Sequence, residues 1–180
     1  MLRKYQVEAL AAFCTLIIVC ICMSADRAGS TGVPKKAAVF AFELEDTSHE
    51  GELRGKRADE TMRLAALDQL MLTKLRSSGR FEVVDLSVVA AQVESSTPLR
   101  KCNGCAADIA KEAGAEVAIV GWVQKVSNVI LNVNIEIEEA ATGKILDRAS
   151  ADIRGNTDES WKRGLDYLLR NRILKASGGG

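Results

Sequence analysis

Alternating apolar and polar side chains between positions 129 and 138 give the clearest structural signal in the chain. Such a period of two is typical of a β-strand with one face on a core and the other toward solvent. The expected inward set is Val129, Leu131, Val133, Ile135 and Ile137, and the expected outward set is Ile130, Asn132, Asn134, Glu136 and Glu138. The turn-forming residues at 141–144 then predict a partner strand over 145–153.

Short apolar runs predict three further strands. One covers 37–42, soon after Pro34, and another covers 81–84. The run over 117–123 is too uniformly apolar for a strand with one wet face, so we expect it to lie in the centre of the sheet.

Helical spacing predicts the elements between and after these strands. Leu64, Leu67, Met71 and Leu75 form one apolar stripe, and Gly79 is a plausible end of that helix. Two shorter helices are expected over 86–93, beginning at Asp85 or Ser87, and over 106–113, ending at Gly114. A last helix is expected after a cap at Thr157 or Asp158, with Trp161, Leu165, Leu168, Leu169 and Ile173 on its inner side.

Taken in order, these elements predict an α/β fold, with a mixed β-sheet covered by helices and the order β-α-β-α-α-β-β-β-α. We expect one domain over 37–175, a loose linker over 26–36 and a flexible tail over 176–180. The segment 43–57 is acidic and contains glycine, so we expect a long exposed loop there.

The first 25 residues differ in kind from the rest. Arg3 and Lys4 precede an apolar run over 9–23. Fifteen helical residues span about 22 Å, whereas crossing a bilayer takes about 20 residues. We therefore expect 1–25 to be the signal peptide of an exported, periplasmic protein. The alternative is an uncleaved hydrophobic helix that anchors the chain in the inner membrane facing the periplasm.

Composition narrows the range of partners. Basic and acidic residues number 24 each, so the chain has no net charge with which to attract nucleic acid. Aromatic residues are only 4% of the chain, which leaves few platforms for stacking bases or sugars. The sequence contains no phosphate-binding loop, dinucleotide fingerprint or metallopeptidase motif, and we expect no cofactor.

The cysteines agree with export. Cys14, Cys20 and Cys22 lie in the apolar run, and removal of a signal peptide leaves the pair Cys102 and Cys105 for an oxidising compartment. Neither Cys20 nor Cys22 follows the glycine, alanine or serine that a lipid-attachment motif requires.

The spacing of Cys102 and Cys105 leaves three interpretations open. A local structural disulfide is favoured. A redox-active pair is the second, because a helix start lowers the pKa of a thiol, although thioredoxin-type sites directly follow a strand. Metal binding is the third, but His49 is the only histidine that could add a ligand, and haem attachment would need histidine where Ala106 stands.

Two polar clusters could also carry function. His49 lies among Glu43, Glu45, Asp46, Glu50 and Glu52, which could hold a hard cation, but the spacing lacks the regularity of a calcium loop and favours a solvated surface. Trp161 with Lys162, Arg163, Arg170 and Arg172 could form a partner surface, whereas core packing of the tryptophan beside a helix cap is favoured. Trp122 raises the same question, and core packing is again favoured.

Four segments carry a resemblance to known proteins. They read KKAAVFAF, LRSSGRFEVVDLS, AADIAKEAGAEVAIVGWV and EEAATGKILDRAS. Together they resemble the N-terminal domain of the TolB translocation protein and the related curli-secretion (CsgG-type) and outer-membrane lipoprotein activator domains, over 35–174. The resemblance implies a fold rather than an activity. No β-propeller follows, so the task of TolB is not carried over.

Three other segments, CNGC, GWVQKVSN and RGNTDESWKRGLDYLLRN, are similar to a family of exported bacterial proteins of unknown function. That resemblance implies a setting beside periplasmic quinoprotein dehydrogenase systems. The resulting hypothesis is a non-catalytic accessory protein that binds or assembles an envelope protein. The alternatives are thiol-disulfide exchange by Cys102 and Cys105, or a small-ligand site near 43–57.

Overall fold

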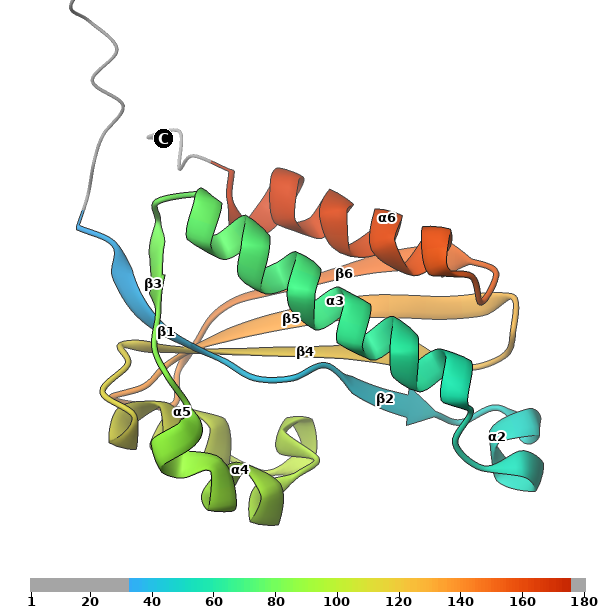
Figure 1. Ribbon diagram of the computed structural model, residues 1–180, viewed down its shortest axis with the longest axis horizontal. Helices are drawn as coiled ribbons and strands as arrows, with labels where there is room; N and C mark the ends of the chain where they lie inside the picture. The colour runs from blue at the N-terminus through green and yellow to red at the C-terminus, as the bar shows by residue number, and fades with distance from the viewer. Residues whose placement is uncertain (1–32, 176–180) are drawn as a thin grey trace, which may run out of the picture. The chain divides into compact units, whose positions relative to one another are not determined.

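A computed structural model describes residues 33–175 and shows a mixed six-stranded sheet (Figure 1). The strand order is β3-β1-β4-β5-β6. The short strand β2 lies off this path and also pairs with β4. The strands are β1 Lys35–Val39, β2 Glu43–Asp46, β3 Phe81–Val83, β4 Val117–Lys125, β5 Ile130–Glu139 and β6 Ile145–Arg154. Pairing is parallel among β1, β2, β3 and β4, and antiparallel through β4, β5 and β6.

Strand β4 lies in the middle of the sheet, as its uniformly apolar sequence predicts. The first part of β4 pairs with β1 and the last part pairs with β2, so the chain bends between these two short strands. Gly121 lies opposite that bend. A Cβ atom at this position would lie 2.5 Å from the Phe42 ring, so only glycine lets the ring lie across β4.

Helices cover both faces of the sheet (Figure 1). They are α2 His49–Arg54, α3 Ala58–Ser77, α4 Ala90–Ser96, α5 Cys105–Glu112 and α6 Asp158–Leu168, and α6 continues as a π-helical turn over Leu169–Ile173. α3 and α6 pack on one face over the larger core, which contains the five inward residues expected for the last helix. α4 and α5 pack on the other face over a smaller core. Thr157 caps α6, and the Thr157 side chain accepts from the Ser160 N–H.

The predicted alternation in β5 is confirmed at four of its five inward positions. Leu131, Val133, Ile135 and Ile137 are buried against α3 and α6. The prediction for Val129 is wrong, since this side chain is 59% exposed. The Val129 N–H donates to the Ser127 hydroxyl, which places Val129 in the turn before β5.

The expected loop over 43–57 is also wrong, and the element order gains a strand and a helix. Glu43–Asp46 form β2, because backbone pairing with residues 122–125 of β4 outweighs the low strand propensity of acidic residues. The Ser48 hydroxyl then accepts from the Gly51 N–H and caps α2. The first strand also begins and ends earlier than predicted, at Lys35 and Val39.

The predicted export segment and the predicted tail lie outside the described residues. Within 33–175, no helix is both long and apolar enough to cross a membrane.

Candidate functional site

A groove runs along the outer surface between α3 and α6. Its cavity volume is about 560 Å³ and its surface is mostly apolar. The residues that line it are Asp59, Met62, Arg63, Ala66, Leu67, Gln69, Leu70, Thr73, Asp158, Trp161 and Lys162. We call it the α3–α6 groove.

The sequence of α3 builds one wall of the groove because it carries two apolar stripes. Leu67, Met71 and Leu75 are buried on the sheet. Met62 lies one helical turn before Ala66, and Leu70 follows one turn after it, so these residues form a second stripe beside the first. The Met62 side chain is 67% exposed, which is unusual for a large apolar residue at helical spacing. The spacing of these residues carries the second stripe, although only the first stripe was predicted.

Trp161 forms the floor of the groove. The residue is only 1% exposed and belongs to the larger core, as the core-packing interpretation expects. The Arg63 guanidinium lies 5.9 Å from the centre of its ring. The indole N–H is buried and has no acceptor among the described residues. A buried donor without an acceptor destabilises the fold, so this tryptophan contributes apolar packing rather than a hydrogen bond.

Charged side chains close one end of the groove. Arg63 pairs with Asp59 at 3.0 Å and with Asp158 at 2.7 Å, and so joins α3 to the start of α6. A hydrogen bond from Arg57 and the nearby charge of Arg63 hold the pKa of Asp59 well below its usual range. Both acids are therefore neutralised by arginines of the same chain.

The predicted partner-surface residues on α6 and the turn that continues it separate into two environments. Lys162 is exposed, lines the groove and makes no ion pair with any other described residue. Arg163 and Arg170 are exposed and pair along the helix, with Glu159 at 3.5 Å and with Asp166 at 2.9 Å. Only Trp161 and Lys162 are brought together in the groove.

Two acidic residues of 43–57, together with one from α3, surround a lysine. Lys125, at the end of β4, is fully buried, and its ammonium group lies 2.6 Å from Glu60, 3.0 Å from Asp46 and 3.7 Å from Glu50. Burial alone would lower the pKa of Lys125, but the hydrogen bonds to Glu60 and Asp46 raise it. The ammonium thus occupies the place where a hard cation was considered, and sequence reasoning missed it because the lysine lies far along the chain.

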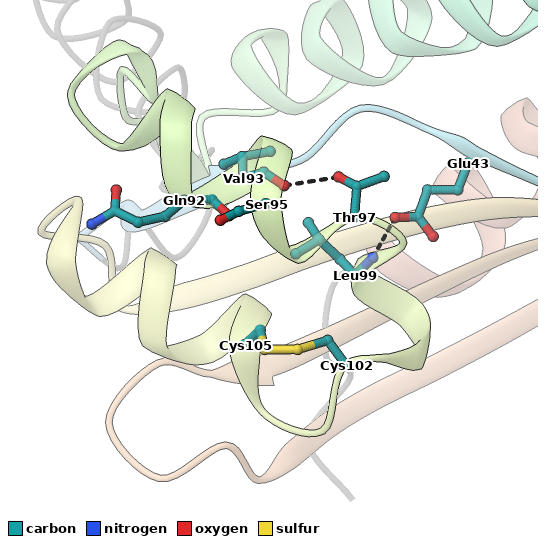
Figure 2. Close-up of a disulfide and its surroundings, with 8 residues drawn as sticks. All are labelled: Glu43, Gln92, Val93, Ser95, Thr97, Leu99, Cys102 and Cys105. Carbon is teal, nitrogen blue, oxygen red and sulfur yellow. Dashed lines mark hydrogen bonds between the residues drawn. A yellow bond between two sulfur atoms is a disulfide. The ribbon is translucent and has the colours of Figure 1, made fainter.

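The remaining members of the acidic cluster are also engaged or solvated. Arg100 pairs with Glu43 at 3.2 Å and with Glu45 at 3.3 Å. Glu43 also accepts from the Leu99 N–H, as Figure 2 shows. The His49 side chain is 85% exposed. Within residues 33–175, no group of three or more histidine, cysteine or acidic side chains is arranged to hold a metal ion.

Cys102 and Cys105 lie at the start of α5, on the opposite face of the sheet from the groove. Their Cα atoms are 5.5 Å apart, and Figure 2 draws the sulfur–sulfur bond between them. This separation is normal for a disulfide. Both residues are half-buried. The formation of this bond in the exported protein stays a prediction.

Similar folds occur among solved structures, all at low identity. The C-terminal domain of LpoB from Escherichia coli is 16% identical, with a TM-score of 0.48, and the match covers 76% of this chain and 92% of that one. Lipoprotein GNA1162 from Neisseria meningitidis is 17% identical, also with a TM-score of 0.48, and the match covers 80% and 99%. TolB from Acinetobacter baumannii is 10% identical, with a TM-score of 0.37, and the match covers 77% of this chain but 28% of TolB.

These similarities concern the arrangement of sheet and helices and carry no argument about activity. The predicted likeness to CsgG-type domains and the association with quinoprotein dehydrogenases stay predictions. No curated protein sequence matches the chain. A family model described as "Protein of unknown function (DUF2380)" matches residues 35–173. Because that match spans well over half of the chain, the protein belongs to the DUF3280 family.

Proposed function

We propose that this protein is an exported, non-catalytic module of the cell envelope that binds a partner protein in the α3–α6 groove. The observation that carries the proposal is the groove itself, an apolar depression between two helices with the exposed Lys162 at its side. Apolar depressions with a few polar groups are typical of binding sites.

The occupant that fits the groove is an amphipathic helix of the partner. The lining of α3 from Asp59 to Thr73 follows helical spacing over about 21 Å, and a third helix lying along it would meet Met62, Ala66 and Leu70 with its own apolar stripe. Asp59 and Asp158 are already neutralised by Arg63, so the positive charge of Lys162 is the one left without a pair among the described groove residues. Lys162 therefore favours an acidic residue on that helix.

Photocrosslinking in intact cells tests this assignment. A photoreactive residue at Gln69, which is exposed in the groove, should give an adduct with one envelope protein, whereas the same residue at Lys111 on α5 should not. Met62→Glu should remove the adduct, because it places a charge on the exposed apolar stripe. The matched control is Ala65→Glu, an exposed position of α3 outside the groove, and it should leave the adduct intact.

Equal adducts from Gln69 and Lys111, or an adduct that survives Met62→Glu, would overturn the groove assignment. Thermal melting of each variant checks that the fold is retained. Export is tested separately with residues 1–40 fused to a reporter that is active only outside the cytoplasm. A reporter that stays inactive would remove the envelope setting.

Thiol-disulfide exchange is the second candidate function. It is favoured by the position of Cys105 as the first residue of α5, where the helix dipole lowers the pKa of a thiol. A thiol titration of the reduced protein separates the two candidates. A catalytic pair has one thiol with a strongly lowered pKa, whereas a structural pair has two ordinary thiols.

A further inference from the structure

The last strand of the sheet has an open edge. β6 is ten residues long and pairs with β5 on one side, and no other described strand lies on its outer side. The opposite edge strand, β3, has only three residues. A long open edge presents a row of unpaired backbone donors and acceptors, which favours the addition of another strand.

The hydrogen-bonding pattern identifies which residues of β6 face outward. The Gly155 N–H donates to the Val129 carbonyl, so this pair of positions is hydrogen-bonded across β5 and β6. Such positions alternate in antiparallel pairs. From Asp147 to Ile153, where the register with β5 is continuous, the odd-numbered residues of β6 therefore bond to β5. The backbone groups of Arg148, Ser150 and Asp152 point to the open edge.

A hollow of about 550 Å³ extends from this edge to α6, and Ala151, Gly164 and Tyr167 are among the residues that line it. A Cβ atom at Gly164 would lie 2.6 Å from a methyl group of Ile153, so the glycine lets α6 lie close to β6. Tyr167 is 53% exposed beside the hollow. The edge therefore offers apolar surface as well as backbone hydrogen bonds.

We propose that the β6 edge binds the β6 edge of a second copy of this chain, in antiparallel register centred on Ser150. A two-fold axis perpendicular to the sheet keeps the α3–α6 faces of both copies on one side. It requires a register in which one residue lies opposite itself, because directly opposed side chains share a face. Centring on Ser150 places Arg148 of each copy opposite Asp152 of the other. Centring one residue later, on Ala151, would instead place Arg148 opposite Arg154.

The charges are available for this pairing. Arg148 and Asp152 are exposed on the same face of β6. Arg148 already pairs with Glu136, but its guanidinium has five donors and the side chain is 60% exposed, so it can bind a second carboxylate. Asp152 accepts from Asn132 through one oxygen, which leaves the other free. The strand is thus complementary to itself in charge, which favours a second copy over an unrelated extended peptide.

Two single charge reversals test both the interface and its register. The wild-type protein should sediment as a dimer, and Arg148→Asp or Asp152→Arg should each raise the dissociation constant at least about tenfold, because two attractive cross-strand pairs become two repulsive ones. An equimolar mixture of the two variants should restore the dimer. In that mixture each aspartate lies opposite an arginine at both paired positions.

Sedimentation velocity and light scattering on the purified full chain measure these states, and circular dichroism checks folding. Ser150→Pro provides an independent variant, since it removes an outward N–H without breaking the ladder to β5, and it should also give monomers. A monomeric wild type, or variants that still form homodimers, would overturn the proposal. Monomeric variants whose mixture stays monomeric would overturn the register. Photocrosslinking in the α3–α6 groove reports separately on the proposed function, on which this inference does not rest.

Discussion

Replacing Lys125 with methionine tests whether the buried ion cluster stabilises the fold. Methionine approximates the length of lysine, so the change removes the charge and leaves little cavity. Glu60, only 1% exposed, would then lose its ammonium partner and keep only the side-chain amide of Asn156 as a donor. Breaking a buried ion pair in this way costs about 3–5 kcal/mol. Because domains of this size are stable by about 5–15 kcal/mol, the loss would be a large fraction of the total.

Urea unfolding followed by tryptophan fluorescence measures this loss, since Trp161 is buried in the same domain. The exposed Lys111→Met on α5 is the control and should cost less than about 0.5 kcal/mol. In the background of Glu60→Gln, the cost of Lys125→Met should fall by about 2 kcal/mol, because no buried carboxylate is left without its partner. A cost of Lys125→Met below about 1 kcal/mol, or equal costs in both backgrounds, would refute the reasoning.

Three further predictions concern the sheet and the cysteines. Val133→Asp buries an unpaired charge and should lower the free energy of unfolding in urea by about 3 kcal/mol or more. Asn134→Asp, on the outer face, should lower it by less than about 1 kcal/mol. Equal tolerance of the two changes would contradict the register. Burial raises the pKa of Glu138 to about 7, so its ionisation opposes folding and stability is lost as pH rises from about 4.5 to 7. After allowance for solvent screening, Glu138→Gln should therefore stabilise the protein by about 1 kcal/mol near pH 8 and change its stability little near pH 4. A stabilisation that is independent of pH would contradict this. Replacing Cys102 and Cys105 with serine removes a disulfide that closes only a very short loop, so stability should fall by about 2 kcal/mol or less. Crosslinking in the groove should stay intact. Loss of all biological activity in a normally folded variant would favour thiol exchange.

The sequence predicted those elements whose signal is local. The alternation from Leu131 to Ile137 and the caps around Thr157 depend on neighbouring residues only, and the structure confirms both. Strand β2 was missed because its acidic side chains are typical of loops. Their counterions, Arg100 and Lys125, lie more than fifty positions away, so pairing that depends on the folded chain left no local pattern.

The groove was missed for a related reason. A single sequence shows that α3 has more apolar positions than one buried stripe needs, but it does not show which of them the neighbouring helix leaves uncovered. Trp161 and Lys162 were predicted as a possible surface, and only their position against Met62 and Leu70 reveals that they share one depression. Sequence spacing thus finds the members of a site within one helix, and the packing of two helices is needed to join them.

The division of the sheet into a parallel and an antiparallel half has a consequence for how the chain assembles. The antiparallel half forms from strands that follow one another. By contrast, β1 must wait for β4, since Ala37 pairs with Val117, 80 positions later. Contacts between distant positions form slowly, because loop closure costs entropy before the pairing is gained. During synthesis the first strand and the stripe of α3 that packs on the sheet therefore emerge long before β4 exists to cover them. Over that interval the nascent chain exposes apolar surface of the kind that holdase chaperones bind.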